Sequence, residues 1–348
     1  MTGVPVQSAL QGAISRLAHN QELSAADAAE AFGVIMRGEA TAVQIAAMLT
    51  ALRVKGETSG IVAGVVRALR EVMVKLPASD PTGLVDTCGT GGGSVQTFNI
   101  STAAALLAAG AGVRIAKHGN RSFTSRCGSA DVLEALGVTI DAPVAKMTSA
   151  LEGAGIVFMY APLMHPAMKH VGPIRRELAI PTVMNIVGPL ANPAGALRQV
   201  VGVADAYRVP ILAGALLELG SIHALVVHGE PGLDEISPLG PTRVVEIREG
   251  ESSEWTVDPS SYGLATTSPE DLAGGDPSDN ARIIEEILSG RGTEGGRSAV
   301  LLNAAAAIYV SGRVSNFADG VDAARAALDQ REGLAALERL RAAYSEHS

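Results

Sequence analysis

The chain changes from a strand to a helix through the stretch Asp86-Thr-Cys-Gly-Thr-Gly-Gly-Gly-Ser-Val-Gln-Thr-Phe-Asn-Ile-Ser-Thr102, where a glycine cluster precedes hydroxyl residues and an alanine-rich run. Glycines at 89 and 91–93 let the backbone take positive φ and approach an anion closely. Backbone N–H groups at the start of a helix predicted over 103–109 point toward the same place. The stretch therefore predicts a cradle for phosphate, with pyrophosphate as the natural ligand.

Two common glycine motifs do not fit this segment. The dinucleotide-binding fingerprint needs glycine or alanine where Ser94 stands, and an acidic residue about 20 positions further on is missing. The P-loop requires Lys-Ser or Lys-Thr after the glycines, which is also absent. Taken alone, the cluster is explained equally well as a tight strand-to-helix turn.

A second apolar strand leads into the basic loop Lys117-His-Gly-Asn-Arg-Ser-Phe-Thr-Ser-Arg-Cys-Gly-Ser129. Its cations Lys117, Arg121 and Arg126 can donate charge-assisted hydrogen bonds to phosphate oxygens. The alternative is a solvated basic loop.

A third strand ends in a loop with the adjacent carboxylates Asp234 and Glu235. Mg²⁺ binds through one or two carboxylates and completes its shell with water and substrate phosphate. An Asp-Glu pair is more often a solvated surface, but beside two phosphate loops a magnesium site is the better interpretation.

Composition agrees with an ordinary globular protein. The chain has 348 residues, which predicts two domains, with 47% hydrophobic and 18% charged residues. A net charge of −9 argues against general nucleic-acid binding, so local features must capture a polyanion. Neither a run of about 18 apolar residues nor a signal sequence is visible, which predicts a cytoplasmic protein with Cys88 and Cys127 as reduced thiols.

Apolar spacing predicts N-terminal helices over residues 8–19, 24–37, 41–54 and 58–75, with Ser24 as a cap. A breaker-rich linker follows at 75–83. Beyond it, strands are predicted near 84–88, 113–117, 156–158, 182–185, 200–203 and 223–228, alternating with helices. Further helices are expected near 278–289, 301–310 and 318–345. The pattern predicts an α/β fold: a small helical domain and a larger domain with a mainly parallel central sheet.

Five segments then occur in an order and spacing that resemble the anthranilate phosphoribosyltransferase family of tryptophan biosynthesis: Gly89-Thr-Gly-Gly, Asn99-Ile-Ser-Thr, Lys117-His-Gly-Asn-Arg-Ser, Asn185-Ile-Val-Gly-Pro-Leu-Ala-Asn-Pro193 and Gly232-Leu-Asp-Glu235. The resemblance runs from about residue 10 to about residue 340. It implies a helical, dimer-forming domain over 1–76 with a returning segment near 163–180. It also implies an α/β domain over 80–348 that binds 5-phosphoribosyl 1-diphosphate.

The implied reaction transfers the phosphoribosyl group from that diphosphate to the amine of anthranilate and releases pyrophosphate. The resemblance assigns substrate binding to Gly89, Gly92, Gly93, Thr97, Asn99, Ile100, Ser101, Thr102, Lys117, His118, Gly119, Asn120, Arg121, Ser122, Ser125, Ser129 and Arg175. Ser101, Asp234 and Glu235 match magnesium positions, with two ions expected per site. Gly89, Asn120 and Arg175 match anthranilate contacts. No residue is assigned as a general acid or base.

Some positions depart from the family or have another interpretation. Gly93 stands where relatives often carry aspartate, so any contact there is made by backbone. Leu163 and Met164 replace more polar residues at the expected anthranilate entrance. Arg175 could instead belong to a solvated helix face, and the 185–193 segment is interpreted as a turn after a buried strand.

Three other functions remain open at this point. A pyrimidine nucleoside phosphorylase would share the two-domain fold but has a different second loop. A nucleic-acid-binding relative is opposed by the acidic charge, and a dinucleotide-dependent oxidoreductase is opposed by the failed motif.

Overall fold

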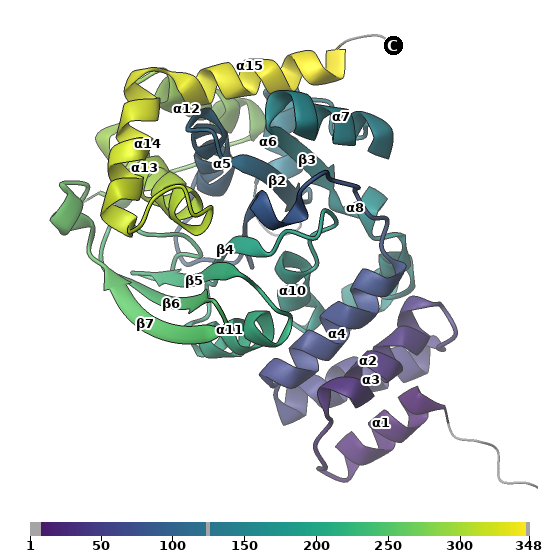
Figure 1. Cartoon of the computed structure of the whole chain (residues 1–348). Helices are drawn as coiled ribbons and strands as arrows, with labels where there is room; N and C mark the ends of the chain where they lie inside the picture. Colours follow the sequence, from purple (N-terminus) through teal and green to yellow (C-terminus); the bar gives the residue numbers. More distant parts are fainter. Residues whose placement is uncertain (1–7, 123–125, 267, 346–348) are drawn as a thin grey trace, which may run out of the picture.

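The computed structural model describes residues 8–122, 126–266 and 268–345, and it begins with a bundle of helices drawn in purple in Figure 1. These are α1 (Ala9–Ala18), α2 (Ala25–Met36), α3 (Ala42–Lys55) and α4 (Ser59–Val72). Each begins at a hydroxyl residue whose side chain accepts a backbone N–H of the first turn: Ser8, Ser24, Thr41 and Thr58. The predicted bundle and the cap at Ser24 are confirmed.

A seven-stranded sheet forms the centre of the larger part, in the order β3-β2-β1-β4-β5-β6-β7. The strands are β1 (Leu84–Gly89), β2 (Arg114–Gly119), β3 (Ile156–Tyr160), β4 (Arg198–Gly202), β5 (His223–Gly229), β6 (Thr242–Arg248) and β7 (Glu251–Val257). The first five pair in parallel, whereas β6 and β7 add antiparallel strands at one edge. The predicted α/β class with a mainly parallel sheet is confirmed.

Helices cover both faces of this sheet (Figure 1). The helices beyond the bundle are α5 (Ile100–Gly110), α6 (Ser129–Ala135), α7 (Val144–Ala154), α8 (Ala161–Met164), α9 (Gly172–Leu178), α10 (Met184–Val187), α11 (Val209–Glu218), α12 (Pro277–Leu288), α13 (Glu294–Val310), α14 (Phe317–Asp329) and α15 (Glu332–Ser345). One core joins β1–β3 to α5–α7 and the C-terminal helices. The other joins β4–β6 to α10, α11 and the bundle.

The bundle contacts the larger part through several of its helices. Helix α4 packs along α11, and α9 lies against α3. Between them, the linker after α4 pairs through the Val74 N–H with the Met164 carbonyl and through the Leu76 N–H with the Pro193 carbonyl. Segments 161–178 and 188–193 therefore lie at the junction between the bundle and the sheet.

Three expectations need correction. Residues 182–185 are not a strand, because Met184–Val187 forms the short helix α10. The antiparallel strands β6 and β7 were not expected. The stretch 318–345 is two helices rather than one, because Arg331 takes a left-handed φ of 57° between α14 and α15. Within the described residues, no helix is both long and apolar enough to cross a membrane.

Candidate active site

The candidate site lies where the connections of the parallel sheet change direction. Strand β1 pairs with β2 on one side and with β4 on the other, and the chain leaves β1 toward β2 before returning later to β4. Such a switch point opens a crevice outside the carboxyl ends of the strands. The three loops singled out in the sequence follow β1, β2 and β5 at this edge.

The glycine loop and the acidic loop are in direct contact. The Gly91 N–H donates to Asp234 Oδ2 at 2.7 Å, and the Ser94 N–H donates to the Gly232 carbonyl at 3.0 Å. A Cβ on Gly89 would stand 2.5 Å from Asp234 Oδ2, which no real Cβ tolerates. A side chain at position 89 would therefore displace the Asp234 carboxylate, which occupies that space.

Gly93 also faces the acidic loop. A Cβ there would lie 3.1 Å from the Gly232 carbonyl oxygen and 3.5 Å from Asp234 Oδ1. A larger side chain would press on the loop that carries Asp234, so this chain contributes backbone alone at this point.

A buried lysine joins the first and second loops. Lys117, which is 3% exposed, donates from Nζ to the Thr87 carbonyl at 2.6 Å and lies 3.4 Å from Ser101 Oγ. The Ser101 N–H in turn donates to Glu235 Oε1 at 3.0 Å. The three loops thus place one ammonium, one hydroxyl and one carboxylate together.

The first N–H groups of α5 are less open than the sequence suggests. The helix begins at Ile100, earlier than the predicted 103, and the Ile100 N–H pairs with the Phe98 carbonyl. The Ser101 N–H serves Glu235. The Ala103 N–H, at the predicted start of the helix, donates to the Asn99 carbonyl. The expectation of unpaired N–H groups there is therefore wrong, and the Gly92 and Gly93 backbone becomes the better candidate for phosphate.

Burial makes the charges of this cluster unfavourable. It raises the pKa of Glu235 to about 8, with a further increase from Asp234 and an opposing effect of Lys117. Burial also raises the pKa of Asp234, against the hydrogen bond from Gly91. For Lys117, burial lowers the pKa, and the charges of Asp86 and, to a smaller extent, Glu235 oppose that shift. Adjacent carboxylates that are poorly solvated gain from a divalent cation.

Magnesium fits this donor set. Within the described residues, no group of three or more histidine, cysteine, aspartate or glutamate side chains is placed to hold a metal. A pair of carboxylates beside the Ser101 hydroxyl is what Mg²⁺ uses when substrate phosphate and water supply the other ligands. Asp234 and Glu235 are the residues that would hold it.

A fully buried carboxylate lies behind Lys117. Asp86 is 0% exposed and accepts the His118 N–H at 3.2 Å and Asn192 Nδ2 at 2.8 Å. Asn192 Nδ2 also donates to the Ala116 carbonyl at 2.8 Å. Burial raises the pKa of Asp86 to about 6, and the hydrogen bond from Asn192 and the charge of Lys117 oppose that shift. This carboxylate fixes the end of β2 and connects it to the 188–193 segment.

Two histidine rings meet beside this carboxylate. His118 and His165 pack edge to face with ring centroids 4.9 Å apart. Burial lowers the pKa of His118 to about 3, with the neighbouring His165 and Lys117 adding to the effect, and it lowers the pKa of His165 to about 4. Both rings are therefore neutral at physiological pH. His118 Nε2 is buried and has no partner among the described residues.

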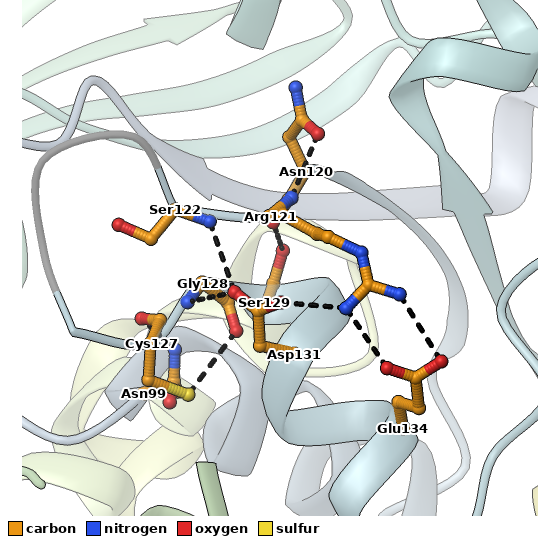
Figure 2. A network of polar contacts seen from close by, with 9 residues as sticks. All are labelled: Asn99, Asn120, Arg121, Ser122, Cys127, Gly128, Ser129, Asp131 and Glu134. Atoms are coloured by element: carbon orange, nitrogen blue, oxygen red, sulfur yellow. Dashed lines mark hydrogen bonds and ion pairs between the residues drawn. The ribbon is translucent and has the colours of Figure 1, made fainter. Parts of the chain in front are cut away.

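The second loop is held by an acidic residue of α6. Asp131 Oδ2 accepts the Ser122 N–H at 3.1 Å and the Gly128 N–H at 2.9 Å, as Figure 2 shows. The same view shows Arg121 directed at α6, where Nη1 lies 2.8 Å from Asp131 Oδ1 and 2.9 Å from Glu134 Oε2. The carboxylates of Asp131 and Glu134 thus balance the charge of the Arg121 guanidinium. A substrate at this loop would therefore meet the Arg121 backbone rather than its side chain.

The turn after β2 is close-packed. A Cβ on Gly119 would collide with Ser129 Oγ, and that hydroxyl donates to the Asn120 carbonyl at 3.3 Å. Asn120 Oδ1 accepts the Arg121 N–H at 2.8 Å. Gly119, Asn120 and Ser129 therefore lie together, while Ser125 lies outside the described residues.

Asn99 connects the first loop to distant parts of the chain. Its Nδ2 donates to the Cys127 carbonyl at 3.2 Å, and its Oδ1 accepts Asn280 Nδ2 at 2.9 Å. The Phe98 N–H beside it donates to the Leu272 carbonyl at 2.9 Å. Ile100 is 1% exposed and packs in the core. The described contacts of Asn99 and Ile100 therefore hold the first loop in place.

Arg175 stands apart from these loops, on α9 beside the bundle. Burial lowers the pKa of its guanidinium, which nevertheless stays charged at neutral pH, and no described residue forms an ion pair with it. Its neighbour Arg176 is exposed. Arg175 is therefore a partly buried cation available to an anionic ligand.

Three supporting residues were missed in the sequence. Asn303 on α13 accepts the Ile236 N–H at 2.9 Å and donates to the Ile236 carbonyl at 2.9 Å, which fixes the chain just after Glu235. Asp86 and Asp131 support the first two loops. Asp86 and Asn303 could have been found as polar residues inside an apolar strand and an apolar helix. The sequence around Asp131 contains no comparable signal for a supporting role.

Fold and site together define a class. A helical bundle is attached to a mainly parallel α/β sheet, and the glycine, lysine and twin-carboxylate loops at its switch point offer groups that suit a magnesium-bound polyanion. Residues 11–73 match the helical bundle domain of a glycosyl transferase family, and residues 81–336 match its a/b domain.

Comparison with individual proteins identifies the family within this class. An anthranilate phosphoribosyltransferase of Rubrobacter xylanophilus is 49% identical over 330 residues, which are 95% of this chain and 96% of that protein. The crystal structure of anthranilate phosphoribosyltransferase from Thermus thermophilus has a TM-score of 0.90 at 40% identity and covers 95% of this chain and 98% of its own. The structure of the Saccharomyces cerevisiae enzyme in complex with PRPP and Mg has a TM-score of 0.86 at 29% identity. The match covers 96% of this chain and 97% of that chain. The chain belongs to the anthranilate phosphoribosyltransferase family.

Proposed function

We propose that the protein transfers the phosphoribosyl group of 5-phosphoribosyl 1-diphosphate to the amine of anthranilate, in tryptophan biosynthesis. The C1–O bond to the diphosphate breaks, a C1–N bond forms, pyrophosphate leaves and the amine loses its proton. The observation that carries the proposal is that three loops meet at one edge of the sheet. The glycine loop contacts Asp234, and Ser101 contacts both Lys117 and Glu235. Relatives at 49% identity over nearly the whole chain support it.

The chain's own groups act mainly by binding and orientation. Backbone N–H groups of the 89–93 loop and the Lys117 ammonium are suited to the diphosphate, which must carry away negative charge as C1 becomes cationic. Asp86 and Asn192 hold the β2 end that carries Lys117. Because the aromatic amine is neutral, attack needs position rather than a general base. The neutral rings of His118 and His165 agree with that.

Mg²⁺ is the proposed cofactor, with two ions per site held by Asp234, Glu235 and the Ser101 hydroxyl. When bound, it neutralises charge on the diphosphate. Two neighbouring structures in the family are described with magnesium, one of them with PRPP as well. The remaining residues of the proposed binding set are those named for substrate above, with Gly89, Asn120 and Arg175 toward anthranilate.

The proposed organisation is a homodimer of two-domain chains, with domains over 1–76 and 80–348 and the segment 163–180 returning to the bundle. Helix α3 supports a bundle-mediated dimer, because Val43 and Val54 on it are 78% and 83% exposed. Apolar side chains this open on one helix are suited to a partner surface. The cytoplasm is the proposed compartment, in keeping with Cys88 and Cys127 as thiols.

A fluorescence assay tests the activity. Anthranilate fluorescence is followed with 5-phosphoribosyl 1-diphosphate and Mg²⁺, and each component is then omitted in turn. Loss of anthranilate only in the complete mixture is the expected result. Inactivity toward anthranilate combined with cleavage of thymidine by phosphate would replace this function with nucleoside phosphorolysis.

A further inference from the structure

A second hollow lies among the C-terminal helices. It has a volume of about 340 Å³, and its lining residues belong to the stretch from Ser289, just after α12, to Arg331, just after α14. None of them belongs to the candidate active site. The volume is at the lower end of the range for small-molecule pockets.

The charge of this hollow is opposite to that of the chain. Arg297, Arg325 and Arg331 line it, against the single carboxylate of Asp329, whereas the whole chain carries −9. Helix α13 supplies Arg297, α14 supplies Arg325, and Arg331 follows α14. Guanidinium groups from separate elements repel one another unless an anion lies between them.

These arginines have few ionic partners in the described chain. Arg297 Nη1 donates to the Gly290 carbonyl at 3.1 Å, and Arg325 donates to the Tyr262 carbonyl. The ion pair of Arg325 with Asp322 is long, at 3.7 Å. Arg331 makes no side-chain hydrogen bond or ion pair with a described residue. Neutral carbonyls therefore orient the Arg297 and Arg325 guanidiniums, and the long contact with Asp322 is the ion pair that Arg325 has among the described residues.

The exposed Arg331 has an uncommon backbone conformation, which Asn20, Ala179 and Glu249 share among the described non-glycine residues. It has φ 57° at the turn between α14 and α15, where helices commonly end on glycine. A long side chain in this conformation is less favourable than glycine. Its presence here brings a third guanidinium to the hollow, and such outliers often mark a binding role.

We propose that this hollow is a binding site for a small organic oxyanion with an apolar body, such as a phosphate monoester. The arginines would pair with the oxyanion through forked N–H groups. Leu301 and Leu328, each 6% exposed, supply an apolar wall for the rest of the ligand. The site is independent of the function proposed above.

Phenyl phosphate is the probe, used without Mg²⁺ on the full chain. Labelling of arginine with phenylglyoxal is followed residue by residue by mass spectrometry. Arg297 and Arg331 are expected to be protected by phenyl phosphate, whereas the exposed neighbour Arg291, which does not line the hollow, is not. Because labelling is local, ligand at the active site does not interfere. Unchanged labelling of Arg297 and Arg331 at saturating phenyl phosphate overturns the proposal.

Calorimetric titration gives the second measurement. Arg297→Gln with Arg331→Gln should remove one class of phenyl phosphate site or weaken it by about tenfold or more, because each lost guanidinium removes a charge-assisted hydrogen bond. Arg291→Gln should bind like the wild type. Equal binding by the double variant and the wild type, with both folded by circular dichroism, would refute the site.

Discussion

The Gly91 N–H donates to Asp234 Oδ2 at 2.7 Å and so connects loops separated by more than a hundred residues of sequence. Gly89 lies beside this contact, and the Asp234 carboxylate fills the space that a side chain at position 89 would need. The glycine loop therefore has two tasks, to present backbone N–H groups and to admit the acidic loop. Its geometry sets where a magnesium ligand stands relative to the phosphate cradle.

Gly89→Ala should disturb the acidic loop directly. The added methyl would meet Asp234 Oδ2 at 2.5 Å, and shifts near 1 Å in a positioning group can lower turnover by about a hundredfold. We expect kcat/KM for the diphosphate to fall at least about tenfold. Gly153→Ala on α7 is the control, because a Cβ there has nothing within 4 Å. Equal activity in the two variants would contradict the packing argument.

Asp234→Asn keeps the shape of the side chain and removes its charge. We expect a higher Mg²⁺ concentration for half-maximal rate and a lower maximal rate, because one of the two carboxylates is lost. Chelation with EDTA should abolish activity in the wild type. Asp141→Asn, which alters an exposed carboxylate, serves as the control. A Mg²⁺ titration unchanged by Asp234→Asn would remove this residue from the metal site.

Arg175→Ala should act on the aromatic substrate. A partly buried guanidinium pairs well with a carboxylate, so its loss should raise the KM for anthranilate about tenfold or more and leave the KM for the diphosphate nearly unchanged. Arg176→Ala removes an exposed cation one residue away and should behave like the wild type. The assignment fails if the two variants have the same anthranilate KM.

Glu246 should make stability depend on pH. Burial alone would raise the pKa of its carboxyl, but hydrogen bonds from His223, Tyr309 and Trp255 outweigh burial and lower it. A lowered pKa stabilises the fold above the unfolded value of about 4.3 and loses that contribution as pH falls through the folded pKa.

Glu246→Gln should therefore cost about 1–3 kcal/mol in the free energy of unfolding near neutral pH, and the difference should shrink as pH falls below about 4.3. Denaturant titrations at several pH values measure this. Glu254→Gln removes an exposed partner of Arg243 on the adjacent strand and should change little. A pH-independent difference for Glu246→Gln would contradict the pKa argument.

Val43→Glu combined with Val54→Glu should dissociate the proposed dimer. Charges on α3 would oppose burial of this face against a second copy. Light scattering after size exclusion measures the mass. Tyr207→Glu, at an apolar residue 76% exposed on another element, should leave the mass unchanged. A wild-type protein that is monomeric at assay concentrations would disprove this mode of assembly.

Much of the fold could be predicted because the four bundle helices begin at hydroxyl caps and the central strands are mostly apolar runs. The 182–185 strand was wrong because the short stretch Thr182-Val-Met-Asn185 suits the start of a short helix equally well. Strand β7 was missed because most of its residues are exposed and polar, such as Ser252 and Glu254. The break at Arg331 was missed because arginine gives no turn signal.

The loops of the candidate site could be located from glycine, lysine and carboxylate spacing, but their contacts could not. Whether Arg121 faces a substrate or α6 depends on Glu134, thirteen positions further along the chain. Likewise, the pairing of Ser101 with Glu235 follows from the sheet order. Tertiary contacts of this kind have no local sequence pattern.

The most direct test of the account measures pyrophosphate release and anthranilate loss in the same reaction. The three loops are proposed to form one site that couples departure of the diphosphate to attack by the amine. One pyrophosphate should appear for each anthranilate consumed, only with Mg²⁺ present, and Asp234→Asn should lower both rates together. Pyrophosphate release at an undiminished rate without anthranilate, or no loss of anthranilate at all, would contradict the account.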